Sequence, residues 1–480
     1  MSLAEHVSQR AEKKESSMTQ QTQVTTTAET AAGFAAGLDP REVAEAVLTR
    51  IAEREPVLNA FYLHDPDQVR ADAAASAARW AAGTQRSKYD GVPVTVKENI
   101  PRAGHPVPSG TALANPQIAQ SNAPVTDRLL EAGMVILGST TMPDWGMLSS
   151  GVSSLHGISR NAWDPALTTG GSSAGAGAAA AAGYGPLHVG TDIGGSIRLP
   201  GTWAGLATLK PSAGLVPLHA PYLGRAAGPM TRTVADAAAL MSVIARPDAR
   251  DYSTRPYPQM DWTKILASPR GLRVGLQLDA GPGAAVDPEV AAAIQSAAEM
   301  FSAAGATVVP VAPFLTQEVL TGIDAFWRTR SWADYQALDE EARGSLLPYI
   351  ARWCTGGKDY DGAATIQNYQ RFGQLQQMTR EATEGFDLVL SPVAPMAAFG
   401  AEDPMPSNDP DMPMTHISFT LPYNMSGQPA ATINCGFTSD GRTIGLQVAG
   451  RVGADDDVLA ACAWYESVRG DAAPDWSRVP

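Results

Sequence analysis

Two clusters of glycine and serine constrain the folding of this chain more than any other feature of its sequence. The first is GGSSAGAG at residues 170–177, and the second is TDIGGSIRLP at residues 191–200. Between them, the alanine-rich run 176–182 is typical of a helix and the apolar segment 187–189 favours a strand. Because the first cluster leads straight into this helix, we do not interpret it as a flexible linker. Both clusters are expected to be ordered parts of an α/β fold.

Helix and strand signals surround the two clusters. Asp-Pro pairs at 39–40 and 65–66 combine an N-cap with proline at the first helical position, which is typical of a helix start. The run 92–96 favours a strand that ends at Lys97, and 271–311 reads as strand, helix and strand, the order of a βαβ unit. Other helices are expected at 125–133, at 233–245, within 313–385 and after 457, and other strands at 134–137, 386–392, 430–437 and 443–448. The segment 142–171 has little periodicity, and such long stretches inside a compact domain are often functional.

The charge balance restricts the partners of the chain. Its 480 residues include 35 basic and 49 acidic side chains, a formal net charge of −14, so a nucleic acid would meet net repulsion. Residues 1–30 are polar and lack the apolar core of a signal peptide, so we expect a disordered tail. Apolar runs elsewhere are shorter than the roughly 18 residues of a membrane-spanning helix. We therefore expect a cytoplasmic protein that binds neither nucleic acid nor membrane.

The cysteines and histidines do not match a familiar metal motif. Cys354, Cys435 and Cys462 lack C-x-x-C spacing, and the seven histidines include no H-E-x-x-H pair. We expect the cysteines to be reduced core residues and the protein to need no metal or cofactor.

The first glycine cluster also matches a dinucleotide-binding pattern. Residues 175–180 fit G-x-G-x-x-A, and Asp192 lies roughly where an acidic residue could contact a ribose. The segment 158–169, however, does not read as the buried strand that must precede such a loop. Alanine-rich sequence also produces this pattern by chance, so the interpretation is disfavoured.

The same cluster matches the nucleophile elbow of serine hydrolases, because 171–175 fits G-x-S-x-G with Ser173 at its centre. That chemistry requires a histidine later in the chain, and three histidines follow: His188, His219 and His416. His188 lies in an apolar strand and His219 in a proline-flanked turn. Only His416 remains as a candidate base, and a structural histidine is the more common outcome.

A third interpretation uses a serine whose base is not histidine. Ser196 follows Ile193, Gly194 and Gly195, and such a turn can direct successive backbone N–H groups into one concavity, as in an oxyanion hole. The base must be neutral near pH 7, and Lys97 at its strand end is the best candidate. A lysine pKa of about 10.4 must then be lowered by burial.

These residues resemble a known family. The run GGSSAGAGAAAAAGYGPLHVGTDIGGSIRLP resembles the signature of the amidase signature hydrolases, and GVPVTVKEN resembles their lysine-bearing strand. The runs LPYNMSGQPAATINCGF and DGRTIGLQVAG are similar to their closing strands. The resemblance covers about residues 38–466. It implies one large α/β domain over 31–470, a mixed central sheet between helices, with 313–425 as a variable region lining the substrate site.

The resemblance also implies roles for individual residues. Ser196 would be the acylated nucleophile, Ser172 the bridging serine after a cis peptide, and Lys97 the final base. The oxyanion hole would comprise four backbone N–H groups, those of Ile193, Gly194, Gly195 and Ser196. The proton would pass from Ser196 through Ser172 to Lys97.

Five neighbouring residues carry further expectations. Asp192 and Arg198 flank Ser196, and we expect them to support the turn rather than react. Met147 and Ser149 lie in the stretch that forms one wall of the substrate pocket in the family. Ala174 departs from the motif, which usually has Gly or Ser there, so the shape of the turn beside Ser172 is in question.

The predicted function is hydrolysis of an amide-type C–N bond through an acyl-enzyme. Amides, esters and carbamates (urethanes) are all compatible with such a site. The alternatives are the glutamine-hydrolysing subunit of a tRNA-dependent amidotransferase and a non-catalytic member of the fold. The partner is expected to be a small molecule, and a homodimer is left open.

Aromatic and methionine residues in 313–425 suggest the substrate class. They are Phe314, Phe326, Trp327, Trp332, Tyr335, Tyr349, Trp353, Met396, Phe399, Met405, Met412, Met414 and Met425. Many must be core residues, but Met-rich and aromatic loops also make adaptable apolar pockets. Given the net charge, we expect uncharged aryl-containing substrates to be preferred over small polar amides such as free glutamine.

Overall fold

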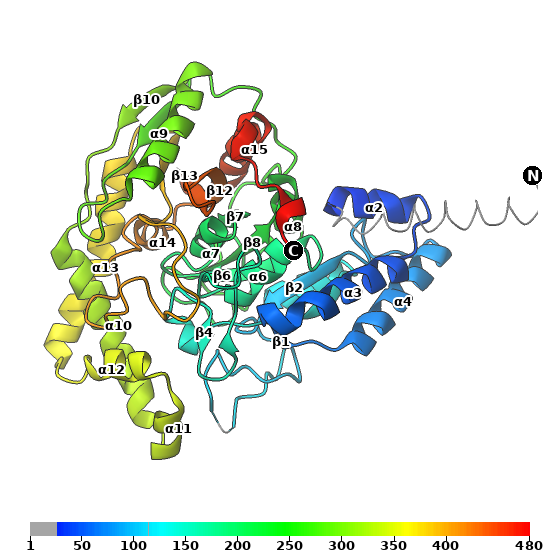
Figure 1. The fold of residues 1–480 in the computed structure, drawn as a ribbon, viewed down its shortest axis with the longest axis horizontal. Helices are drawn as coiled ribbons and strands as arrows, with labels where there is room; N and C mark the ends of the chain where they lie inside the picture. Colours follow the sequence, from blue (N-terminus) through cyan, green and yellow to red (C-terminus); the bar gives the residue numbers. More distant parts are fainter. Residues whose placement is uncertain (1–25, 114) are drawn as a thin grey trace, which may run out of the picture.

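The computed structural model describes residues 26–113 and 115–480, shown in Figure 1. The helices are α2 (Thr27–Ala35), α3 (Pro40–Leu58), α4 (Pro66–Ala82), α5 (Pro124–Glu131), α6 (Ala174–Ala182), α7 (Arg198–Trp203), α8 (Val234–Ile244), α9 (Pro288–Ala303), α10 (Gln317–Ala337), α11 (Glu340–Ser345), α12 (Pro348–Thr355), α13 (Gly362–Thr383), α14 (Leu421–Met425) and α15 (Asp455–Val468). Three short 3₁₀ turns are η1 (Asp144–Gly146), η2 (Gly470–Ala472) and η3 (Trp476–Arg478). The strands are β1 (Phe61–Leu63), β2 (Pro93–Lys97), β3 (Val135–Thr140), β4 (Val152–Ser153), β5 (Gly157–Ile158), β6 (Leu187–Asp192), β7 (Ala207–Lys210), β8 (Ala226–Thr231), β9 (Arg273–Leu276), β10 (Thr307–Pro310), β11 (Leu388–Pro392), β12 (Ala430–Phe437) and β13 (Thr443–Gly450).

Within the described residues, eleven strands form one mixed sheet in the order β1-β3-β2-β6-β8-β7-β12-β13-β11-β9-β10. Strands β3, β2 and β6 run parallel, as do β11, β9 and β10, while the central strands pair antiparallel. The predicted βαβ unit is confirmed as β9-α9-β10. The predicted α/β class with a mixed central sheet is also confirmed.

Helices cover both faces of the sheet. Buried residues of α5, α8, α9 and α15 share one apolar cluster with strand residues such as Val94, Val96 and Leu446. On the other face, α3, α4 and α6 pack with Val135 and Leu137, and α10, α12 and α13 form a third cluster with Leu199 and Trp203. Figure 1 shows α2, α3 and α4 at one end of the molecule and α10 to α13 at the other.

Strand β2 explains how a lysine reaches the interior. All five of its residues are buried, and successive side chains in a strand point to opposite faces. Val94 and Val96 lie in the cluster with α5 and α8, so Thr95 and Lys97 point to the face covered by α6. The helix caps are local, as predicted: Asp39 and Asp65 accept backbone N–H groups at the starts of α3 and α4, and Gly83 ends α4 with φ of 67°.

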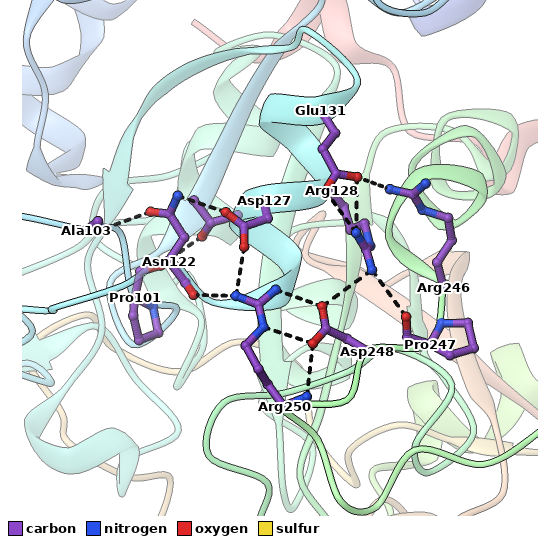
Figure 2. A network of polar contacts seen from close by, with 11 residues as sticks. Pro101, Ala103, Asn122, Asp127, Arg128, Glu131, Arg246, Pro247, Asp248 and Arg250 are labelled. Atoms are coloured by element: carbon purple, nitrogen blue, oxygen red, sulfur yellow. Dashed lines mark hydrogen bonds and ion pairs between the residues drawn. The ribbon is translucent and has the colours of Figure 1, made fainter.

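A polar network anchors the segment between β2 and α5, which follows Lys97 (Figure 2). Arg250 pairs with Asp127 of α5 at 2.7 Å and with Asp248 at 2.7 Å, and it donates to the carbonyl oxygen of Asn122 at 3.1 Å. Asn122 in turn accepts from the N–H of Ala103 at 2.7 Å and donates to Asp127 at 2.9 Å. Hydrogen bonds within the segment therefore fix its shape, and the contacts of Arg250 join it to the chain that follows α8.

Both expected ends of the folded domain need correction. Residues 27–30 begin α2, because Thr26 and Glu29 form a reciprocal capping box that the polar composition concealed; residues 1–25 of the expected tail lie outside the described residues. At the C-terminus, the fold continues past 470, since Trp476 packs 5.2 Å from the ring of Trp163 and Val479 is buried.

Two further expectations can be compared with the structure. Cys354, Cys435 and Cys462 are buried and unpaired, as predicted. None of the described helices combines the length and the apolar character that crossing a membrane would require.

Candidate active site

Lys97 meets two serines at the start of α6. Its Nζ donates to Ser172 Oγ at 2.8 Å and to Ser173 Oγ at 3.1 Å. The Gly171–Ser172 peptide is cis, as the resemblance implied. All three side chains are buried, with Lys97 and Ser173 fully inaccessible. The structure thus brings Lys97 and Ser172 into direct contact although 75 residues separate them.

The surroundings of Lys97 favour its neutral form. Burial, followed by the positive charge of Arg225, lowers the pKa of Lys97 well below its ordinary value, and the charges of Glu98 and Asp192 oppose this only in part. A neutral amine can accept a proton near pH 7, whereas an ammonium group cannot. The lowering of the Lys97 pKa is thus in the direction that a lysine base requires.

Ser173 does not have the environment of an elbow nucleophile. Its Oγ donates to the carbonyl oxygen of Thr191 at 3.0 Å and accepts the Thr191 N–H at 3.1 Å. His188 is occupied elsewhere, with Nδ1 2.9 Å from Thr95 Oγ1 and Nε2 3.1 Å from the Gly185 carbonyl. Ser173 therefore joins β6 to the start of α6.

The turn from β6 to α7 is organised by Asp192. Its carboxylate accepts the N–H groups of Gly195 at 2.8 Å and Ile197 at 3.1 Å. The expected oxyanion hole needs correction here, because the Gly195 N–H is directed at this carboxylate. Gly195 also has φ of +130°, and a Cβ there would lie 2.7 Å from Thr420 Oγ1, so a side chain is excluded. Among the described residues, the N–H groups of Ile193, Gly194 and Ser196 have no acceptor.

Arg198 holds Asp192 in place. Its guanidinium donates to both Asp192 oxygens at 3.0 Å, to the Thr420 carbonyl at 3.0 Å, to Gln447 at 2.7 Å and to Asn424 at 2.6 Å. Burial by itself would raise the pKa of Asp192, but the charge and hydrogen bonds of Arg198 outweigh it and hold the pKa below its ordinary value. This geometry agrees with a supporting role for both residues.

Ser196 opens onto a cavity of about 130 Å³. Ser196, Ile193 and Gly194 are only partly buried and line it, whereas Ser172 and Ser173 are buried and are not among its lining residues. Gly146 also lines it, and a Cβ at Gly146 would lie 3.2 Å from Ser172 Oγ, so the cavity reaches close to Ser172. Ser196 is thus the accessible serine of the three.

The walls of the cavity come from two distant parts of the chain. Met147 and Ser149, both expected there, line it from the 142–171 segment, and Trp327, Met405 and Met414 line it from 313–425. Other aromatic residues of that region are core; Trp353, for example, is buried and donates to Asp324 at 2.9 Å. Ala174 is fully buried at the first turn of α6 and is not among the lining residues.

His416 lines the same cavity, but the serine that it contacts is Ser149 and not Ser172, Ser173 or Ser196. Its Nε2 lies 2.7 Å from Ser149 Oγ, and burial lowers its pKa to about 3. Sequence reasoning weighed this histidine as a base or as a structural residue and did not predict its place in the cavity wall. It also missed Arg330 of α10 and Trp145 of η1, which line the cavity and which no motif distinguishes.

The dinucleotide interpretation is not supported by the local geometry. Gly175 packs against the neighbouring backbone, since a Cβ there would lie 2.1 Å from the Ala60 carbonyl oxygen. In the described part of the chain, no strand lies between β5, which ends at Ile158, and the start of α6 at Ala174. Within that part, no group of three His, Cys, Asp or Glu side chains is arranged to hold a metal ion.

Comparisons with known proteins identify the relatives of this chain. The family model described as Amidase matches residues 42–459. An acylamidase of Rhodococcus erythropolis is 33% identical over 442 residues, covering 90% of this chain and 92% of that protein. A subunit of the Glutamyl-tRNA(Gln) amidotransferase of Synechococcus sp. (strain RCC307) is 32% identical over 456 residues, covering 89% and 93%.

Among solved structures, a bacterial aryl acylamidase of the amidase signature family superimposes with a TM-score of 0.84 and 27% identity, covering 95% of this chain and 97% of that one. The family model, the acylamidase and this solved structure agree on one class of protein, the amide-hydrolysing enzymes. This chain belongs to the amidase signature family, and it is an amide-hydrolysing enzyme of that family.

Proposed function

We propose that the enzyme hydrolyses aryl acylamides, and by the same chemistry aryl esters and carbamates, with Ser196 as nucleophile, Ser172 as proton relay and Lys97 as base. The observation that carries the proposal is that one serine is accessible from the cavity while a second, buried serine contacts the buried lysine. Ser196 lines the cavity, and the buried Lys97 Nζ lies 2.8 Å from the Oγ of the buried Ser172.

In the acylation step, Ser196 Oγ attacks the carbonyl carbon and forms the new C–O bond. Its proton passes to Ser172 Oγ as the Ser172 proton passes to the neutral Nζ of Lys97. The oxyanion is stabilised by the N–H groups of Ile193, Gly194 and Ser196, because preorganised donors in a partly dry site interact strongly with developing charge.

The C–N bond then breaks, and the proton returns from Lys97 through Ser172 to the departing amine nitrogen. Water hydrolyses the Ser196 ester by the same relay: Lys97 and Ser172 take its proton, the C–O bond to Ser196 breaks, and Ser196 regains a proton. No net charge or proton is left on the enzyme at the end of the cycle.

The cavity favours an apolar acyl or leaving group. Trp145, Leu199, Trp327, Met405 and Met414 supply large apolar surfaces, and adaptable apolar walls suit aryl groups. None of the described lining residues is acidic, so the α-ammonium group of free glutamine has no carboxylate partner there. These features support an arylamide substrate over glutamine.

The second candidate is glutamine hydrolysis within an amidotransferase, which the similarity to the Synechococcus protein favours. It predicts activity on glutamine and dependence on partner proteins. The proposed function predicts that the chain alone, as a monomer or homodimer, hydrolyses arylamides. Its substrate is a small molecule, and no nucleic acid takes part.

The test combines covalent labelling with two assays. A fluorophosphonate should add one adduct per chain, mapped to the peptide that contains Ser196, and Ser196→Ala should abolish both the adduct and the release of 4-nitroaniline from a 4-nitroanilide. Ser407→Ala, at an exposed serine, is the matched control and should retain both. An adduct on Ser173, or hydrolysis of glutamine without the anilide, would overturn the assignment.

A further inference from the structure

We propose that Arg330 makes this site selective for substrates that carry a carboxylate away from the scissile bond. The proposal rests on the proposed function, because it concerns substrates of the same cavity. It adds a specificity-determining residue and a charge to a pocket whose other walls are largely apolar.

Arg330 is a cation in the cavity wall without an acidic partner. It lies on α10 (Gln317–Ala337), lines the cavity that contains Ser196, and is partly buried. Its Nη2 lies 3.5 Å from the Met147 sulfur, and its guanidinium carbon lies 5.3 Å from the ring centroid of Tyr222. A thioether sulfur is only a weak hydrogen-bond acceptor. The face of an aromatic ring attracts a cation but offers no lone pair to its N–H groups. Among the described residues, no oxygen accepts a hydrogen bond from Arg330.

The neighbouring Arg328 shows what an ordinary structural arginine of this helix does. It pairs with Asp324 at 2.6 Å and donates to the carbonyl oxygen of Pro410 at 2.5 Å. Asp334, one turn after Arg330, is exposed and forms no ion pair with it in the described part of the chain. The contacts of Arg330 therefore position the side chain but leave most of its five N–H donors available.

A carboxylate is the group that fits these donors best. The guanidinium fork matches the two oxygens of a carboxylate in a bidentate geometry, and such charge-assisted bonds are stronger than neutral ones. The partly buried position reduces screening by solvent. Trp327 and Met147 beside Arg330 can hold an apolar stem between the carboxylate and the reacting carbonyl.

The inference revises the expectation drawn from net charge. A formal charge of −14 is spread over the whole surface, where salt screens it beyond about 10 Å. The acidic side chains are absent from the described cavity wall, whereas one arginine is present. The described wall of the cavity therefore carries a positive formal charge.

The experiment compares matched substrates that differ in one charge. The acyl-side pair is the mono-4-nitroanilide of glutaric acid and the corresponding terminal amide. The amine-side pair is the butyryl amide of 4-aminobenzoic acid and that of 4-aminobenzamide. For at least one pair, kcat/KM of the wild-type enzyme should be roughly tenfold or more higher for the carboxylate.

The readout is the ratio of kcat/KM for the carboxylate substrate to kcat/KM for its amide counterpart, and not either rate by itself. Arg330→Met should bring the ratio to within about twofold of one, and Arg330→Lys should retain part of it, because a point charge keeps attraction without the bidentate geometry. Arg352→Met is the matched control, since Arg352 is 65% exposed and paired with exposed Asp411; it should leave the ratio unchanged. An equal loss of activity on all substrates in Arg330→Met, or equal ratios in wild type and variant for both pairs, would overturn the proposal.

A binding measurement separates this inference from the proposed function. In the Ser196→Ala variant, calorimetry should show tighter binding of the preferred carboxylate than of its amide, and Arg330→Met added to that variant should remove the difference. If no anilide is hydrolysed but this difference is found, the proposed function fails and the Arg330 site stands. If Ser196→Ala binds the carboxylate and the amide equally well, or if adding Arg330→Met leaves the difference unchanged, the Arg330 site is overturned.

Discussion

Replacing Arg198 with methionine is the sharpest test of how the nucleophile turn is built. All five guanidinium hydrogen bonds described above would be lost, two of them to Asp192. Both side chains are completely buried, so Asp192 would become a buried charge without its cation. The N–H groups of Gly195 and Ile197 and the amide of Asn424 would remain as its donors.

The expected loss of stability follows from that burial. Breaking a buried ion pair by removing one partner costs about 3–5 kcal/mol. With an unfolding entropy of about 2.1 cal/mol/K per residue, a chain of 480 residues that unfolds as one unit changes its Tm by about 1 °C for each 1 kcal/mol. Arg198→Met should therefore lower Tm by about 3–5 °C near pH 8.

The pH dependence of this loss has a defined sign. In the native protein the pKa of Asp192 is lowered, so its stabilising contribution is present above the ordinary carboxyl pKa and is lost only as pH falls through the lowered value. Without Arg198, burial dominates and raises that pKa. A carboxyl group whose pKa is raised in the folded state destabilises the fold most at pH values above that pKa. The deficit in Tm should therefore shrink as the pH is lowered from 8 to 5.

Scanning calorimetry at both pH values measures these changes, and two variants control them. Arg352→Met removes an exposed arginine and should change Tm by less than about 1 °C, because exposed ion pairs contribute about 0–1 kcal/mol. Adding Asp192→Asn to Arg198→Met removes the uncompensated charge and should recover part of the loss. A double variant less stable than the single one, or a deficit that grows toward pH 5, would refute this account of the turn.

The remaining predictions concern the proton relay and the pocket. Lys97→Met should lower kcat/KM on an anilide by at least about a hundredfold more than His416→Ala, because the relay passes through lysine; a larger effect of the histidine change would contradict it. Because burial lowers the pKa of Lys97, kcat/KM should rise with pH and reach its plateau well below pH 10.5, whereas an acid limb centred near the ordinary lysine value would contradict a neutral base. Prolonged EDTA treatment should leave activity intact, and loss with rescue by zinc would disprove the metal-free mechanism. Ala174→Gly should change kcat/KM by less than about threefold, since its methyl is buried away from the cavity; a larger gain would show that the methyl narrows the turn.

The sequence by itself determined the features that depend on local chemistry. Asp39 and Asp65 cap their helices as the Asp-Pro pairs predicted, and β9-α9-β10 forms where apolar periodicity indicated it. The motif also predicted Lys97, Ser172 and Ser196 as site residues, because their spacing and residue types form a recognisable pattern. Capping, periodicity and turn chemistry act over a few residues, so they can be read from the chain.

Other features were decided by the tertiary structure because they depend on residues distant in the chain. Strand β8 (Ala226–Thr231) contains glycine and proline and has no strand signal, yet pairing with β6 and β7 makes it central. The Gly195 N–H points to Asp192 because Arg198 and Asn424 hold that carboxylate, while Gln447 in turn accepts from Arg198. Arg330 enters the cavity only because α10 packs beside the Ser196 turn. Net charge and motif spacing carry no information about which cation lines the cavity, since long-range packing alone decides it.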